Sequence, residues 1–132
     1  MPRGKIDFTV HRYNAFVELF WHTVKSRPDH HIDVRQIVTQ MCRAGAPRFW
    51  ISEERALRVV RAALRTGQLP PLRTAVRRMY TDLLAVVRRL LDTTPGLTLT
   101  DAVYRAVNSP APNFYYSPEY ARCLIYRLLR KT

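Results

Sequence analysis

Arginine side chains dominate the chemistry that this sequence can offer. The chain of 132 residues carries 19 arginines and 3 lysines against 10 acidic residues, for a formal net charge of +12. A planar guanidinium group matches the geometry of phosphates and base edges, and a large positive excess raises the local concentration of polyanions. Nucleic acid is therefore the first ligand class to consider. Positive charge also keeps a protein in solution, so composition alone does not identify a partner.

The basic residues that could contact nucleic acid gather around two predicted helices, 53–66 and 118–130. Each follows a short helix and a connector, which is the order of a helix-turn-helix, where exposed side chains of the last helix meet base edges. The alternative is that these residues form the ordinary solvated faces of surface helices. The candidates for groove contact are Arg55, Arg58, Arg61, Arg122 and Arg127. The full set of candidate nucleic-acid contacts is Arg48, Arg55, Arg58, Arg61, Arg65, Arg73, Arg77, Arg122, Arg127, Arg130 and Lys131.

A catalytic or metal-binding arrangement is not recognisable in the sequence. There are no paired carboxylates, Ser/His/Asp set or Cys/His pair of the needed pattern, and the 4 glycines form no phosphate-binding loop. His30 and His31, with Asp29 and His22 nearby, do not define a metal geometry. We expect no catalytic residue, metal site, cofactor or small-molecule substrate.

The cysteines and the hydropathy pattern bear on the cellular compartment. Cys42 and Cys123 fall in apolar helical patterns, which predicts buried free thiols in a reducing cytoplasm. The first ten residues lack the apolar run of a signal peptide. No segment approaches the roughly 20 apolar residues that span a bilayer. We expect a cytoplasmic protein that does not bind membranes.

An internal repeat organises the elements that must position the arginines. The segment Ala46-Pro47-Arg48-Phe49-Trp50 returns 65 residues later as Ala111-Pro112-Asn113-Phe114-Tyr115, and apolar positions on both sides match at the same offset. The basic positions do not follow the repeat. Arg55, Arg58 and Arg61 correspond to Tyr120, Cys123 and Tyr126. The predicted core is therefore repeated while the surface is not, so the two halves are not expected to read equal DNA half-sites.

Each repeat predicts three helices. A long amphipathic helix, with apolar stripes over 10–24 and 76–91, comes first. A short helix follows, over 34–44 and 99–107, and after a connector of about eight residues the third helix begins. The predicted N-terminal caps of the second and third helices are Asp33, Thr98, Ser52 and Ser117. Sustained strand alternation is absent.

These elements predict an all-α fold of about six helices in two repeated trihelical, helix-turn-helix-like units that share one core. A single domain is expected over 1–132, with unit one at 9–67, unit two at 72–131 and a hinge at 67–71. We expect the two long helices to pack against each other through their apolar stripes.

The repeated aromatic loops have two interpretations. Base stacking is one, but their recurrence at one place in both repeats favours packing for Phe49 and Phe114. The sequence leaves both interpretations possible for Trp50, Tyr115 and Tyr116, because adjacent residues of an extended segment point in opposite directions.

The expected function is nucleic-acid binding, with DNA as the preferred partner and RNA as the second. A basic N-terminal arm of Arg3, Lys5 and Arg12 could follow phosphates or be a frayed terminus. The rival is a protein–protein adaptor, or a small structural protein, that has no enzymatic activity. An adaptor would dock its partner on a contiguous apolar patch including Trp50, Tyr115 or Tyr116.

Overall fold

The chain is helical throughout its ordered elements. The structure, a computed structural model, describes residues 8–28 and 32–131. Their secondary structure is all α apart from one isolated bridge, which confirms the predicted fold class. The six helices are α1 (Phe8–Ser26), α2 (Val34–Ala44), α3 (Glu53–Thr66), α4 (Thr74–Thr93), α5 (Leu99–Val107) and α6 (Pro118–Arg130).

Side-chain caps start four of these helices where the sequence predicts them. The Ser52 hydroxyl oxygen accepts a hydrogen bond from the Arg55 amide at 3.2 Å, and Ser117 does the same for the Tyr120 amide at 3.1 Å. Asp33 and Thr98 cap α2 and α5 in the same way. Each cap satisfies an amide that the first helical turn leaves without a partner. At the end of α3, Gly67 adopts a left-handed conformation, and its amide donates to the Ala63 carbonyl at 2.8 Å.

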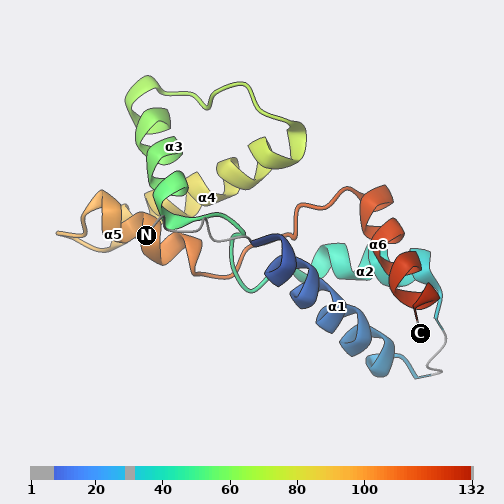
Figure 1. Cartoon of the computed structure of the whole chain (residues 1–132). Coiled ribbons are helices and arrows are strands. Elements are labelled where there is room, and N and C mark those ends of the chain that lie inside the picture. The colour runs from blue at the N-terminus through green and yellow to red at the C-terminus, as the bar shows by residue number, and fades with distance from the viewer. Residues whose placement is uncertain (1–7, 29–31, 132) are drawn as a thin grey trace, which may run out of the picture.

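The helices pack in two groups that cut across the sequence repeat. In one group α2 packs against α1 and α6, and in the other α5 packs against α3 and α4. We call these the first lobe (α1, α2, α6) and the second lobe (α3, α4, α5), and Figure 1 shows them at opposite ends of the molecule. Each lobe thus takes its third helix from the other half of the chain.

This grouping differs from the one expected from sequence. The expected units of three consecutive helices would pack α2 on α3 and α5 on α6, as in a helix-turn-helix. Neither pair, nor α1 with α4, is among the helices that pack closely in the described residues. The connectors 45–52 and 109–117 are long enough to carry α3 and α6 away from the helices that precede them, which a three- or four-residue turn does not allow.

The two connectors cross between the lobes. The Ala46 amide donates to the Ala111 carbonyl at 2.8 Å, and the Ala111 amide donates back to the Ala46 carbonyl at 2.9 Å, which makes an antiparallel bridge. These two residues occupy the same position in the sequence repeat. A second backbone bond runs from the Phe49 amide to the carbonyl of Val107, at the end of α5, at 3.0 Å. Equivalent positions of the two repeats are therefore hydrogen-bonded to each other at the crossing.

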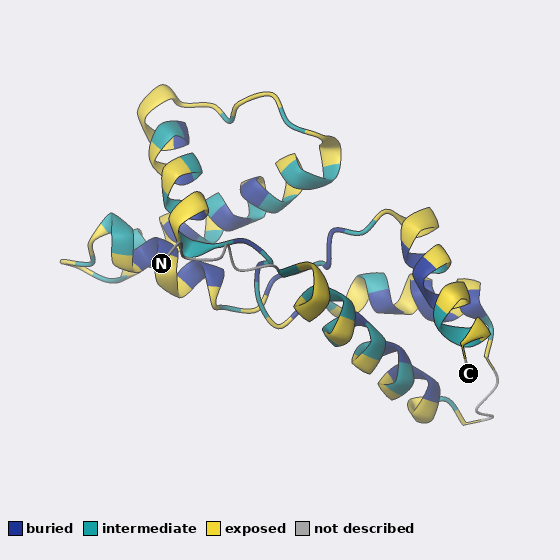
Figure 2. Cartoon of the chain, in the orientation of Figure 1, coloured by how far each residue is buried: buried dark blue, intermediate teal, exposed yellow. Residues whose placement is uncertain are grey.

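Aromatic rings surround the crossing and join the lobes into one core. Phe49 stacks on Tyr115 and Trp50 on Phe114, each pair with ring centroids 6.4 Å apart. Phe16 of α1 meets Phe114 edge-on at 5.3 Å. Phe49 and Phe114 are buried, as predicted. Figure 2 shows buried residues continuing along both connectors, so the shared core passes through the crossing and does not rest on contact between the long helices.

None of the helices in the described residues is both long and apolar enough to cross a membrane.

Gly45, the first residue of the first connector, has a backbone conformation and a close neighbour that leave no room for a side chain. Its backbone has φ 81° and ψ 174°, a region that only glycine occupies readily. A Cβ atom added there would lie 2.8 Å from the Ala111 carbonyl oxygen. Gly67 has the same φ of 81° but nothing within 4 Å of an added Cβ, so it provides a matched control.

We predict that Gly45→Ala lowers the free energy of unfolding by about 3 kcal/mol or more, through backbone strain and displacement of the Ala111 carbonyl. Gly67→Ala should lower the free energy of unfolding by only about 1–2 kcal/mol, which is the cost of placing alanine in a left-handed conformation. Urea denaturation followed by circular dichroism measures both. Equal losses in the two variants would contradict the close approach of the connectors.

Candidate nucleic-acid interface

A row of arginines follows the outward face of α3. Arg55, Arg58, Arg61 and Arg65 are all exposed. With about 3.6 residues per turn, the four side chains fall within about one third of the helix circumference. They form no ion pair with a carboxylate in the described part of the chain. Their guanidinium groups are therefore available to an external anion.

The opposite face of α3 holds this row in place. Ala56, Val60 and Ala63 are buried there, where α3 packs on α5. At the start of α3, the Asn108 side-chain amide at the end of α5 donates to the Glu53 carboxylate at 2.8 Å. These contacts fix which face of α3 points inward, so the arginine row points away from the lobe.

The first residues of the arginine row lie near α4. Burial raises the pKa of the Tyr80 hydroxyl in α4, while the nearby positive charges of Arg55 and Arg58 act to lower it. Arg55 has the larger of these two effects, so it lies at the end of the row that is nearest to the interior of the second lobe. Arg58, Arg61 and Arg65 form the more independent part of the row.

Further basic residues lie at the start of α4. Arg73 is the N-terminal flanking residue of α4, Arg77 follows one turn later, and both are exposed. They belong to the same lobe as the α3 row. Exposed arginines also occur on α2, α5 and the second half of α4, so positive charge is not confined to one face: Arg35, Arg43, Arg88, Arg89 and Arg105.

The predicted basic residues of α6 belong to the first lobe. Arg127, Arg130 and Lys131 are exposed and Arg122 is half-buried. Because α6 packs on α2 while α3 packs on α5, the structure brings the candidates together as two separate sets, one in each lobe.

Arg48 faces the crossing. Its Nε donates to the Phe49 carbonyl at 3.0 Å and its Nη2 to the Ile51 carbonyl at 3.2 Å. The guanidinium carbon also lies 4.6 Å from the centroid of the Phe8 ring. Burial lowers the pKa of Arg48, opposed by the charge of Glu53. This side chain fixes the shape of the first connector.

Arg12 does the same for the second connector. Its Nη2 and Nε donate to the Phe114 carbonyl at 2.6 and 3.0 Å, and its guanidinium carbon lies 3.9 Å from the centroid of the Tyr116 ring. Burial lowers its pKa, although the charges of Tyr116 and Tyr120 oppose this. Arg12 is thus part of α1 and not of an N-terminal arm. Arg3 and Lys5 lie outside the described residues.

Tyr115 links the crossing to α4. It has a left-handed φ of 61°, unusual for a residue with a side chain. The Asn113 side-chain oxygen accepts from the Tyr115 amide at 2.7 Å, and the Tyr115 hydroxyl donates to the Asp82 carboxylate at 2.6 Å. Sequence reasoning placed Asn113 beside the aromatics but missed Asp82, which no spacing pattern connects to the loop.

The structure settles several other expectations. Tyr115 is buried, while Trp50 and Tyr116 are half-buried.

Cys42 is half-buried, but Cys123 is exposed, so the prediction of two buried thiols is wrong for Cys123. Its helix packs through Leu124 and Ile125, which turns Cys123 outward. Asp29, His30 and His31 lie outside the described residues, and the described ones form no group of three potential metal ligands.

Comparison of the chain with protein-family models, with curated proteins and with solved structures gave no match.

Tyr115 predicts a pH dependence of stability. Burial, the hydrogen bond to Asp82 and the charge of Asp82 raise its pKa in the folded protein, while Arg78 lowers it less. An unfolded tyrosine has a pKa of about 10, so the stabilisation from this group is complete below that pH and is lost as the pH rises above it.

We predict that Tyr115→Phe costs about 2 kcal/mol at pH 8, because a hydrogen bond to a charged partner is lost. The variant should also lose less stability than the wild type between pH 8 and pH 10.5, as measured by urea midpoints. Tyr104→Phe, which removes an exposed phenol from α5, is the control. If Tyr115→Phe loses as much stability as the wild type between pH 8 and pH 10.5, Tyr115 is not the source of this pH dependence.

Proposed function

We propose that the protein binds nucleic acid, with duplex DNA as the preferred form, through the α3 arginine row and the basic start of α4. The observation that carries the proposal is the row itself. Arg58, Arg61 and Arg65 are exposed on successive turns and none is paired with an acidic residue in the described part of the chain. The excess charge of the whole chain, +12, supports the same ligand class.

The dimensions of α3 suit this role. From Arg55 to Arg65 the helix axis rises about 15 Å, and a helix of ordinary diameter enters a major groove about 12 Å wide. Most of the binding energy would come from phosphate contacts. Because α3 is packed on α5 through its other face, the arginines are already placed when the ligand arrives.

This proposal modifies the helix-turn-helix interpretation. The supporting helix is α5 of the other half of the chain, and not the preceding α2. Arg48 is left out of the proposed contacts because two carbonyls and a ring already hold it. Two free thiols, Cys42 and Cys123, fit a reducing compartment such as the cytoplasm.

The adaptor alternative has less support. Its patch was expected on Trp50, Tyr115 or Tyr116, and the structure packs these rings against Phe8, Phe49, Phe114 and Phe16 around the crossing. Tyr115 is buried and Trp50 and Tyr116 are half-buried, so these rings offer only part of their surface to a partner.

We predict that wild-type protein binds random duplex DNA with a strong salt dependence, near about −5 in a log–log plot for six phosphate contacts. The triple variant Arg58→Gln, Arg61→Gln and Arg65→Gln should reduce the magnitude of this slope by about 2–3, since each phosphate contact contributes about 0.9. Fluorescence anisotropy at several salt concentrations measures both quantities.

The control removes the same charge elsewhere. Arg35→Gln, Arg43→Gln and Arg105→Gln together change three exposed arginines of α2 and α5. This variant should keep a slope close to that of the wild type. Equal effects of the two triple variants would contradict a localised site, and no binding at low salt would remove the proposed function.

A further inference from the structure

The outward face of α6 differs from that of α3 although both helices occupy the same place in the repeat. Tyr120, Cys123 and Tyr126 of α6 stand where α3 has Arg55, Arg58 and Arg61. Tyr120 is 48% exposed and Tyr126 is 47% exposed. The equivalent arginines of α3 are exposed too, so α3 packs through its buried face without an aromatic ring at these positions. About half of each tyrosine is likewise open to a ligand.

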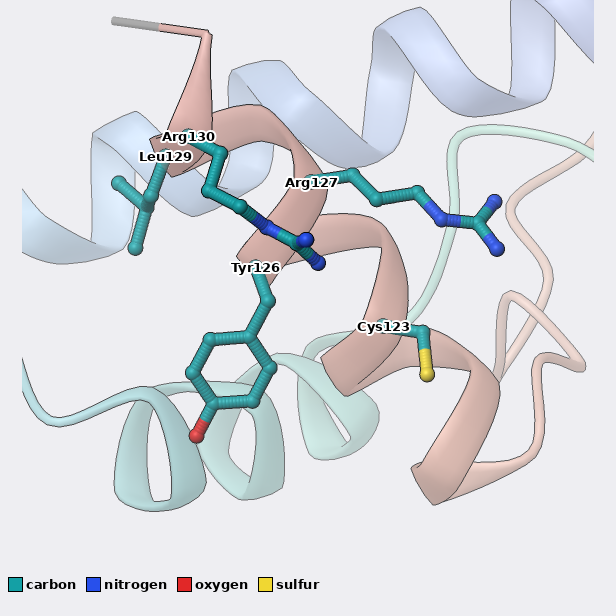
Figure 3. A pocket seen from close by; sticks show the side chains of 5 residues that line it. All are labelled: Cys123, Tyr126, Arg127, Leu129 and Arg130. Carbon is teal, nitrogen blue, oxygen red and sulfur yellow. The ribbon is translucent and has the colours of Figure 1, made fainter.

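Basic residues accompany these rings. Tyr120, Cys123, Tyr126, Arg127 and Arg130 fall within about one third of the helix circumference. Cys123, Tyr126, Arg127 and Arg130 also line a shallow hollow, and Figure 3 shows their side chains projecting from successive turns of α6. Glu119 is the one acidic residue of α6, at its first turn. The face thus combines two aromatic rings with two cations near the end of the helix.

The first ring of this face has a fixed support. The Tyr120 ring lies 5.4 Å from the Tyr116 ring, which in turn carries the Arg12 guanidinium carbon 3.9 Å from its centroid. Burial raises the pKa of Tyr116, which keeps its hydroxyl neutral to higher pH. Tyr120 therefore extends an aromatic surface that the crossing already holds in place.

We propose that this α6 face binds unpaired bases of a single-stranded nucleic acid, which stack on Tyr120 and Tyr126 while Arg127 and Arg130 contact the backbone phosphates. Aromatic platforms combined with a positively charged surface are the general means of holding single strands without sequence preference. About 9 Å of helix axis separates Tyr120 from Tyr126, against about 3.4 Å between stacked bases. Each ring therefore takes its own base.

The inference rests on the proposed function, since both assign a polyanion to the protein, but it assigns a different ligand form to a different lobe. Duplex DNA would meet the arginine row of the second lobe, and an unpaired strand would meet the mixed face of the first lobe.

The test compares a labelled 20-residue deoxythymidine strand with an abasic sugar–phosphate strand of the same length and with a 20-base-pair duplex. Wild-type protein should bind the deoxythymidine strand at least about tenfold more tightly than the abasic strand, because stacking on two rings adds to phosphate contact. Tyr120→Leu with Tyr126→Leu should abolish this preference. Tyr120→Phe with Tyr126→Phe, which keeps both rings, should retain it.

Alkylation of Cys123 locates the strand independently of affinity. Cys123 is exposed between the two tyrosines, whereas Cys42 is half-buried and burial raises the pKa of its thiol. Bound deoxythymidine strand should slow the reaction of Cys123 with a maleimide, followed by mass spectrometry, and leave the rate at Cys42 unchanged. The duplex should protect Cys123 less.

The outcomes separate the two proposals. If the duplex binds but the leucine variant keeps the wild-type preference, or if Cys123 is not protected, the α6 inference is wrong while the proposed function stands. If neither the strand nor the duplex binds at low salt, both proposals are wrong. Circular dichroism confirms that the variants are folded.

Discussion

Two reciprocal hydrogen bonds between Ala46 and Ala111 hold the point where the connectors cross, and the placement of α3 and α6 depends on that crossing. The first connector delivers α3 to α5, and the second delivers α6 to α2. Ala46 and Ala111 are both buried, and stacked rings lie along the same two connectors, Phe49 on Tyr115 and Trp50 on Phe114. Buried polar backbone groups are costly when unpaired, so the pairing of the two connectors is what allows extended chain to run through the centre of a helical protein.

The crossing also explains how one scaffold offers two surfaces. Equivalent residues meet there, and the packing of α3 on α5 mirrors that of α6 on α2. Interior positions of the two halves are therefore constrained alike. The outward faces of α3 and α6 carry no such constraint, and they differ: arginines on one, and tyrosines, a thiol and arginines on the other. Arg12 and Arg48 have a structural role instead, because each supports one connector by donating to its carbonyls.

The sequence predicts the helices well because local rules place them. Ser52 and Ser117 cap α3 and α6 at the expected residues, and the second and third helices have the predicted bounds. The grouping of the helices could not be predicted in the same way. A repeat shows which residues are equivalent, but it does not show which helices pack together. A helix needs the same apolar face whether its partner belongs to its own repeat or to the other one. The exposure of Cys123 was missed for a related reason, since a weakly polar residue fits either side of α6.

The most direct test of the crossing is a map of proton contacts in solution. Nuclear Overhauser measurements on isotopically labelled protein should connect Ala46 with Ala111, and the methyl groups of α3 with those of α5. They should equally connect α6 with α2. Contacts that join α3 to α2 and α6 to α5, with none between Ala46 and Ala111, would contradict the account.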